Sequence, residues 1–272
     1  MKPKSTSARF ASNFRASSAA SFRAALPAKF ILVCALAFAA SVVATIYFCR
    51  SMSGGMAMPG GWTMSMMWMR MPGQSWPISA AMFLLMWFAM MVAMMLPSAL
   101  PTFLKTQRPW DSLCSMASGY FAIWLAFGVG IYALGVALAL VEMHSGLISN
   151  AGPVLMGASL IGAGVFQFTR WKEMHLLRCR SPFGCATSSP QNETSFRLGC
   201  KQGVACCVCC ASPMAILLAL GMMNPFVMIV VTVFIAAEKL LPRPEIVARI
   251  LGVAAIVLGT MALTEQFYAS PI

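Results

Sequence analysis

Charged side chains are scarce in this sequence. They make up 10% of its 272 residues, whereas a soluble domain carries about 25%. Because so few charges cannot cover a globule with water-facing side chains, the composition excludes a soluble single-domain enzyme. Acidic residues are the scarcest, with 7 Asp and Glu against 19 Lys and Arg. The basic residues cluster between long apolar runs, which indicates a membrane rather than nucleic acid as the partner.

The signatures of common enzymes are missing as well. The sequence contains no GxxxxGK[ST] phosphate loop, no GxSxG nucleophile turn and no HExxH zinc motif. Its 2 histidines are too few for a haem site or for a zinc site built from imidazoles. We therefore predict that the protein is not an enzyme and has neither catalytic residues nor an organic cofactor.

Apolar stretches dominate the rest of the chain. Crossing a bilayer takes about 20 mostly apolar residues, and a turn signal at Gly221–Pro225 divides the longest stretch into two. The fold class is therefore all-α, a polytopic transmembrane helix bundle of about seven spans, or six if the first is cleaved as a signal. The predicted spans are residues 30–48, 79–97, 117–140, 153–169, 203–221, 225–240 and 247–264.

The basic residues also predict the orientation. With the N-terminus in the cytoplasm, all 19 of them except Arg50 and Arg70 lie on the inner side, in agreement with the positive-inside rule. The expected organisation is a basic disordered tail over 1–29, a first span or signal anchor over 30–48, a methionine-rich outer loop over 49–78, and a six-helix membrane domain over 79–265 with a cysteine-containing inner loop at 170–202.

Sulfur is abundant where charge is not, with 24 Met and 10 Cys. Thioether sulfur is a soft, neutral ligand that favours Cu(I) over hard ions. The outer loop, punctuated by glycine and proline, is therefore a candidate for soft-metal capture, with adaptable packing against the membrane face as the alternative. Its methionines are Met52, Met56, Met58, Met64, Met66, Met67, Met69 and Met71.

A second group of methionines follows the predicted span 79–97. Residues four apart share one helix face, and such a stripe could pass Cu(I) along the span without charge; ordinary apolar packing is the alternative. The stripe consists of Met82, Met86, Met90 and Met94, beside a shorter one of Met91 and Met95. We select Met90, Met94 and Met95 as candidate metal ligands, and expect Pro97 to end the span.

Four cysteines at the start of the predicted span 203–221 form the third group. At about 100° per residue they occupy one helix face near the inner membrane surface. Thiolates in a low-coordinate site suit Cu(I), and also zinc or another soft metal. The four are Cys206, Cys207, Cys209 and Cys210, and Cys179, Cys185 or His175 of the inner loop could close the site. Cys34, Cys49 and Cys114 are isolated and are interpreted as apolar filler.

A few polar residues lie at the ends of predicted spans. Glu238-Lys239 and Gln167 are functional candidates because ionisable and polar groups are rare inside membranes. Near a helix end, however, such side chains also extend to the interface without any further role.

Together these elements resemble a known family, the predicted metal-binding integral membrane proteins of bacteria classed as domain of unknown function 2182. The resemblance covers about residues 80–262 and implies metal binding in the bacterial inner membrane, with no established reaction. His175 stands where the family usually has cysteine. The matching residues are Trp87, Ala93–Ser98, Gln167, Lys172, Cys179–Pro182, Gly203, Cys206, Cys209, Cys210, Met214, Gly221, Met223, Asn224, Glu238 and Lys239.

The predicted function is soft-metal binding, with copper(I) as the expected metal, in uptake or delivery. Outer thioethers would capture the ion, the methionine stripe would pass it on, and the cysteines would hold it. The expected partners are the lipid bilayer, the metal ion and a metallochaperone or cuproenzyme. Two alternatives stay open: a membrane thiol–disulfide oxidoreductase that uses the overlapping CxxC pairs, and an assembly or structural membrane subunit.

Overall fold

The computed structural model describes residues 6–51, 55–57, 63–65, 68, 73–144, 146–180 and 194–269. These residues form helices and one short antiparallel pair, β1 (Gly55–Ala57) with β2 (Thr63–Ser65). The prediction of an all-α fold is confirmed, apart from this three-residue pair. The helices are α1 (Thr6–Ser51), α2 (Trp76–Lys105), α3 (Trp110–His144), α4 (Gly146–Gln167), α5 (Arg170–Arg180), α6 (Ser195–Leu220), α7 (Pro225–Leu240) and α8 (Pro244–Ala269).

The architecture is that of a membrane protein. Within the described residues, five helices are long and apolar enough to cross a bilayer: α1 over Ala28–Ser51, then α2, α3, α6 and α8. A sixth span results if α4 and α5, bent by 68° relative to each other, are counted as one. The remaining helix, α7, has 16 residues, fewer than the roughly 20 of a full crossing. A bundle of about seven spans agrees with this arrangement.

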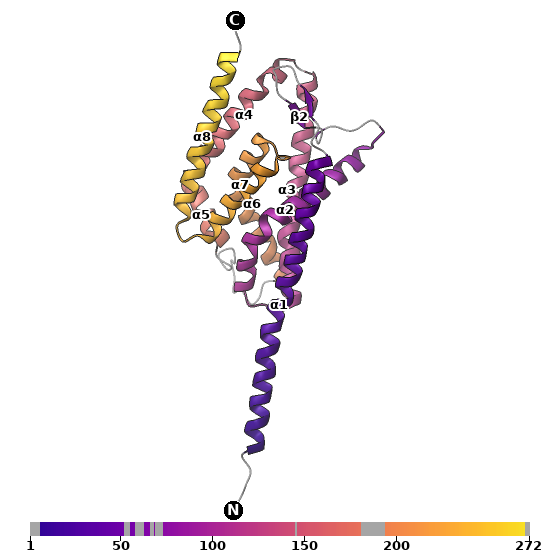
Figure 1. The fold of residues 1–272 in the computed structure, drawn as a ribbon, viewed down its shortest axis with the longest axis vertical. Helices are drawn as coiled ribbons and strands as arrows, with labels where there is room; N and C mark the ends of the chain where they lie inside the picture. The colour runs from indigo at the N-terminus through magenta and orange to yellow at the C-terminus, as the bar shows by residue number, and fades with distance from the viewer. Residues whose placement is uncertain are drawn as a thin grey trace, which may run out of the picture.

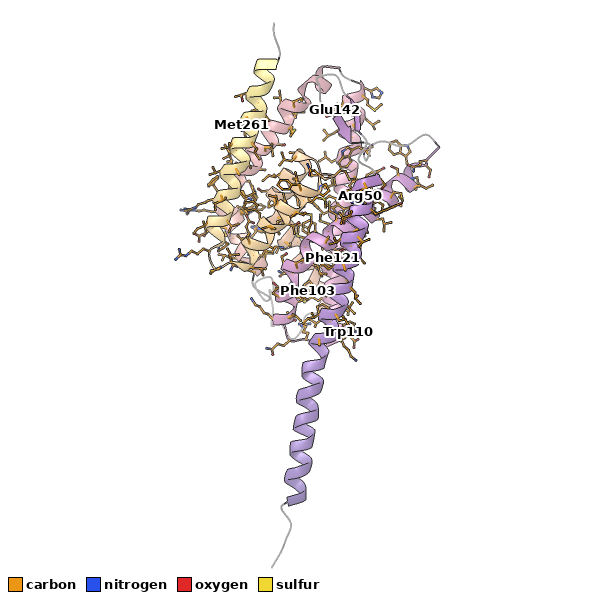
Figure 2. The ribbon with its side chains drawn as sticks, viewed as in Figure 1. Arg50, Phe103, Trp110, Phe121, Glu142 and Met261 are labelled. Carbon is orange, nitrogen blue, oxygen red and sulfur yellow. The ribbon has the colours of Figure 1, made fainter. Side chains whose placement is uncertain are left out.

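The helices are arranged in three groups, as Figure 1 shows. α4 packs along α8 at one flank, α1 packs against α2 and α3 at the other, and α6 with α7 lies between them. The outer surface carries large apolar side chains, among them Leu36, Phe226 and Met261, the last of which is labelled in Figure 2. Such side chains match the hydrocarbon of a bilayer.

The N-terminal region differs from the prediction. We expected a disordered tail over 1–29, whereas α1 begins at Thr6 and extends beyond the other helices (Figure 1). Alanine and arginine are strong helix formers, and neither glycine nor proline occurs between Thr6 and Leu26. The helical periodicity of the first span therefore continues into the tail.

The prediction that Pro97 ends its span is wrong, because α2 continues through Pro97 and Pro101 to Lys105. Each proline removes one intrahelical hydrogen bond, but this part of α2 is packed into the bundle. Ser98 is buried there and donates a hydrogen bond to the Met95 carbonyl at 3.0 Å. The extra turns of α2 provide one wall of the site described below.

Glycines allow α3 and α6 to approach closely. A Cβ on Gly199 would overlap the backbone of Met116, and one on Gly203 would lie 2.9 Å from the Tyr120 carbonyl oxygen. Small residues at four-residue spacing are the usual means by which transmembrane helices come into contact. This crossing places Tyr120 of α3 beside Cys206 of α6.

A sharp turn returns the chain from α6 to α7, as the sequence predicted. Gly221 has a φ of +100°, which glycine adopts without strain. Asn224 then caps α7, its side-chain oxygen accepting hydrogen bonds from the amides of Phe226 and Val227 at 3.0 and 3.4 Å. As a result α7 runs back along α6, and its last turn reaches the cysteines.

The glycine crossing gives a stability prediction. Gly199→Ala forces α3 and α6 apart, so we expect it to lower the free energy of unfolding by about 1–3 kcal/mol. The matched control is Gly162→Ala on α4, where an added Cβ meets nothing within 4 Å, so stability should be unchanged or slightly higher. Thermal unfolding of both variants in detergent measures the difference; equal stability of the two would contradict the assigned crossing.

Candidate metal centre

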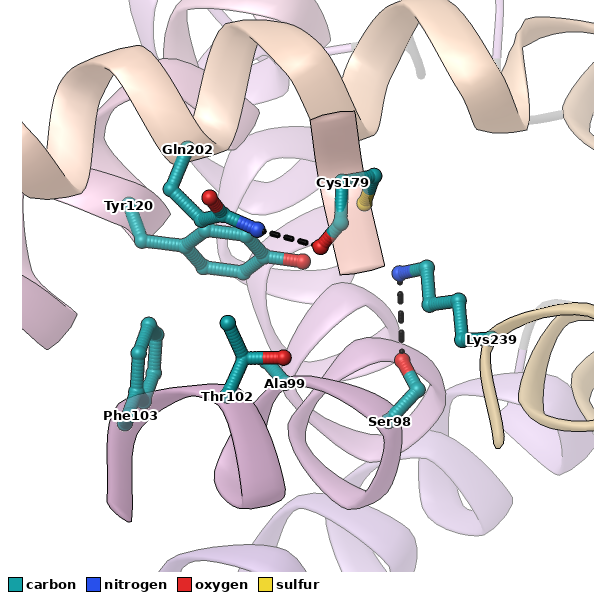
Figure 3. A pocket seen from close by; sticks show the side chains of 8 residues that line it. All are labelled: Ser98, Ala99, Thr102, Phe103, Tyr120, Cys179, Gln202 and Lys239. Carbon is teal, nitrogen blue, oxygen red and sulfur yellow. Dashed lines mark hydrogen bonds between the residues drawn. The ribbon is translucent and has the colours of Figure 1, made fainter. Parts of the chain in front are cut away.

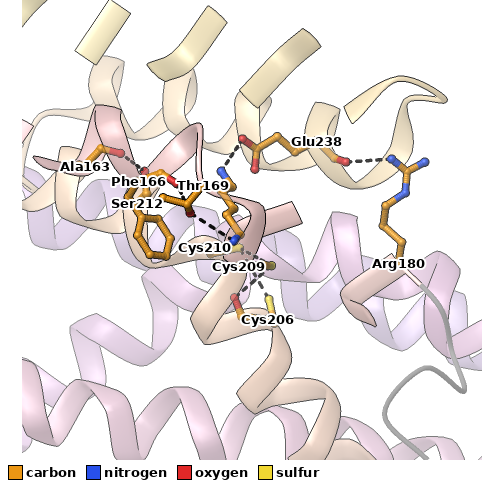
Figure 4. A network of polar contacts seen from close by, with 10 residues as sticks. Ala163, Phe166, Thr169, Arg180, Cys206, Cys209, Cys210, Ser212 and Glu238 are labelled. Carbon is orange, nitrogen blue, oxygen red and sulfur yellow. Dashed lines mark hydrogen bonds and ion pairs between the residues drawn. The ribbon is translucent and has the colours of Figure 1, made fainter. Parts of the chain in front are cut away.

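Buried cysteines from two helices bring their sulfur atoms together. Those of Cys179 on α5 and of Cys206 and Cys209 on α6 lie within 4.8 Å of one another. Cys210 joins them, with its Sγ 3.8 Å from that of Cys206 and 3.6 Å from that of Cys209. We call these four residues the thiol cluster. Figure 4 shows its three α6 members together. Each is at most 4% exposed, so an ion held there would be shielded from water.

Helical periodicity explains the α6 part of the cluster. Positions i, i+3 and i+4 share one helix face, and Cys206, Cys209 and Cys210 occupy such positions, all buried. Cys207 follows Cys206 directly and is only partly buried. The predicted face of four cysteines is therefore a face of three with Cys207 at its flank.

The fourth member comes from a helix that the sequence predicted only as a loop. α5 follows the 68° bend after α4 and carries Cys179 in its last turn. Gln202 of α6 donates a hydrogen bond from Nε2 to the Cys179 carbonyl oxygen at 2.6 Å, the dashed line in Figure 3. This bond attaches the end of α5 to α6 and sets the position of the Cys179 thiol.

A lysine and a tyrosine face the Cys206 sulfur from other helices. Lys239 Nζ lies 2.9 Å from it, and Tyr120 Oη lies 2.9 Å from it as well. Lys239 also donates a hydrogen bond to Ser98 Oγ at 3.1 Å (Figure 3). The sequence predicted Lys239 only as a candidate, and Tyr120 was not predicted. A polar side chain inside an apolar span is the feature that could have identified Tyr120.

A buried ion pair supports this arrangement. Lys172 Nζ on α5 lies 2.8 Å from Glu238 Oε1 on α7, and both side chains are 2% exposed. Arg180, at the other end of α5, donates a hydrogen bond to the carbonyl oxygen of Glu238 at 3.2 Å (Figure 4). It donates a second one to the carbonyl oxygen of Leu241 at 2.6 Å. α5 is thus fixed to α7 at both ends. The amide of Gln167 is buried nearby.

A small cavity of about 10 Å³ lies beside the thiol cluster (Figure 3). This is about the volume that one water molecule or one ion requires. Its wall includes Thr102, Tyr120, Cys179, Gln202 and Lys239. Among the described residues, none offers a hydrogen bond to the buried Gln202 Oε1 atom. The cavity is therefore polar on several sides within an apolar bundle.

The methionines of α2 divide into two sets. Met82 is 39% exposed, whereas the others on the helix are buried: Met86, Met90, Met91, Met94 and Met95. Met95 contacts the lysine that faces the thiol cluster, because its Sδ lies 3.9 Å from Lys239 Nζ. The shorter stripe of Met91 and Met95 thus ends at Lys239, while the roles of Met90, Met94 and Met95 as ligands stay predictions.

The remaining candidates lie away from the cluster or outside the described part of the chain. The His175 ring packs on Trp171 at 4.4 Å between centroids, and its Nδ1 lies 2.9 Å from the Trp171 carbonyl oxygen. Cys49, expected to be isolated, has its Sγ 4.0 Å from Met228 Sδ. Cys185 and the side chains of the outer-loop methionines lie outside the described residues.

Comparison with known proteins gives one match. Residues 84–262 match the family model of PpoB2, described as a copper chaperone. The matched region includes α3 to α7 with the thiol cluster, and also Lys239 and most of α2. No curated protein and no solved structure matches the chain. The match supports the expectation of a copper-related membrane family. The matched family is named PpoB2, and the name domain of unknown function 2182, suggested by the motifs, is not confirmed.

The ion pair gives a prediction about the support of this site. Lys172→Leu leaves the Glu238 carboxylate buried without a partner, which we expect to lower the free energy of unfolding by about 3–5 kcal/mol. In the double variant Lys172→Leu/Glu238→Gln no charge is left unpaired, so most of that loss should be recovered. Thermal unfolding in detergent tests this, and a double variant no more stable than the single one would contradict it.

Proposed function

The chain belongs to the PpoB2 copper chaperone family, which matches well over half of its length, and from that premise we propose that it holds Cu(I) inside the membrane and delivers it to an acceptor protein. The observation that carries the proposal is the buried thiol cluster, in which sulfur atoms from two helices lie within 4.8 Å of one another. Cu(I) is the cargo of this site and is not a resident cofactor.

The donor set favours a soft monovalent ion. Cys206, Cys209 and Cys179 offer sulfur alone, and within the described residues the group contains neither a carboxylate nor an imidazole. Soft thiolate ligands favour Cu(I), and zinc as the next candidate. Structural zinc usually takes four tetrahedral ligands, for which Cys210 would have to join. Two thiolates of the cluster satisfy Cu(I), and the other thiols of the cluster can stay neutral beside them.

The methionines supply a weaker set of donors on one side of this site. Met95 lies against Lys239 and next to the cluster, and Met91 precedes it by one helical turn. With the N-terminus in the cytoplasm, as the basic residues predict, the outer methionine loop and then α2 lead towards the cysteines. Neutral thioethers would accept Cu(I) without adding charge, and the thiolates of the cluster would then hold it more firmly.

The alternative functions are less well supported. Thiol–disulfide exchange requires a thiolate of one partner to reach a sulfur atom of the other, and the cysteines of the cluster are at most 4% exposed. A purely structural subunit gives no reason for several thiols to gather in a hydrocarbon environment. Copper uptake without delivery would use the same site. Transfer of the ion to an acceptor protein distinguishes delivery from uptake.

The first test removes single thiols. Cys206→Ser, Cys209→Ser and Cys179→Ser should each reduce Cu(I) bound by the purified protein, and X-ray absorption of the wild type should show a sulfur-only shell at about 2.3 Å. Cys114→Ser on α3 is the control, since this thiol lies outside the group of neighbouring sulfur atoms. A shell rich in oxygen or nitrogen, or full copper binding by Cys206→Ser, would contradict the proposal.

The second test concerns the methionines of α2. Met95→Leu keeps the packing, at a cost below about 1.5 kcal/mol, but removes the sulfur atom next to the cluster. We expect slower copper loading of the cluster in Met95→Leu and Met94→Leu, measured in proteoliposomes at equal amounts of folded protein. Met82→Leu is the control because this side chain faces outward. If all three variants load at the wild-type rate, the methionines are ordinary apolar packing.

A further inference from the structure

We propose that Lys239 sets the charge of the metal complex: its ammonium group neutralises a Cu(I) ion held by two thiolates, so that the site selects monovalent over divalent soft ions. This inference rests on the proposed function, because it assigns a specificity-determining residue to the same site. Lys239 would not touch the ion as a ligand. It would act through the sulfur atom that it contacts.

The surroundings of Lys239 lead to this assignment. Its side chain is 9% exposed, and its contacts are the Cys206 sulfur at 2.9 Å, the Ser98 hydroxyl at 3.1 Å and the Met95 sulfur at 3.9 Å. Within the described residues no carboxylate lies within ion-pair distance of it. The neighbouring carboxylate, Glu238, pairs with Lys172 instead.

A buried ammonium without a carboxylate partner is costly in an apolar bundle. The cost falls if the group that it contacts carries a negative charge when the site is in use. Cys206 is that group, and a thiolate bound to a metal ion can supply the charge. The ion pair of Lys172 and Glu238 has no net charge, so it neither helps nor opposes this balance.

Counting charges then distinguishes between metals. Cu(I) with two thiolates carries one negative charge, and the ammonium of Lys239 brings the total to zero. A divalent ion with the same two thiolates is already neutral, so Lys239 would leave one uncompensated positive charge. Burying a net charge in a medium of low dielectric constant is unfavourable. The lysine therefore lowers the free energy of the monovalent complex relative to the divalent one.

The lysine is also held in place. It lies at the end of α7, where Arg180 binds the backbone carbonyls of Glu238 and Leu241, and its Nζ is anchored by Ser98. The cavity of about 10 Å³ beside it leaves room for a small displacement when an ion occupies the cluster. Tyr120, on the Cys206 sulfur as well, provides a neutral hydrogen bond and does not alter the count.

The experiment compares Ag(I) with Hg(II), two soft ions that both favour two thiolates and differ by one charge. Affinities are measured by chelator competition on the full-length protein in detergent. Lys239→Leu should lower the affinity for Ag(I) and Cu(I) by about tenfold or more, as truncation of one partner of a buried charge pair does, while the affinity for Hg(II) stays equal or rises. Lys239→Arg keeps the charge and should retain the wild-type preference. Methionine is avoided because it would add a sulfur ligand.

The controls separate the possible failures. The variant Lys172→Leu/Glu238→Gln removes the neutral ion pair and should leave the ratio of the two affinities unchanged. If Lys239→Leu does not fold, Lys239→Gln gives the same comparison with a polar neutral side chain. An unchanged ratio in these variants, or an equal loss of both ions, would overturn the role of Lys239. If the wild type binds neither Cu(I) nor Ag(I), the proposed function itself fails.

Discussion

Charge that lies inside a bilayer must be balanced within the protein, and the geometry of the site depends on this constraint. The opposite charges of Lys172 on α5 and Glu238 on α7 balance each other. Their pairing, with the two hydrogen bonds of Arg180, holds a short helix of 11 residues against the bundle. A helix of this length is marginal on its own. These polar contacts stabilise α5 and thereby bring Cys179 to the cysteines of α6.

The close crossing of α3 and α6 has a similar effect on the other side of the cluster. Gly199 and Gly203 have no side chains that would hold the helices apart. Tyr120 consequently reaches the Cys206 sulfur. Cys206 is therefore contacted from α3, α5 and α7, and Lys239 in turn is held by Ser98 of α2. An enclosed set of thiols with fixed neighbours is preorganised for an ion, because little ordering remains to be done on binding.

Much of the fold followed from the sequence, because the spacing of charges and apolar runs is a local property. The seven predicted spans all coincide with helices, and the sharing of one face by Cys206, Cys209 and Cys210 followed from the helical period. What could not be predicted depends on contacts distant in sequence. The approach of Lys239 to Cys206 joins residues 33 apart, and that of Tyr120 joins residues 86 apart. The end of α2 was misplaced for the same reason, since packing against other helices outweighs the local effect of Pro97.

The same constraint accounts for where the two kinds of sulfur lie. A thioether binds a metal ion without becoming charged, so the methionines of α2 can be buried without a positive group beside each of them. A thiolate ligand is anionic and needs a positive group beside it in an apolar surrounding. Lys239 lies between the two kinds of sulfur, 2.9 Å from Cys206 and 3.9 Å from Met95. A cysteine ligand on α2 would require a second buried cation, whereas methionine requires none, and this difference favours thioethers along α2 and thiols on α5 and α6, where Lys239 lies beside them.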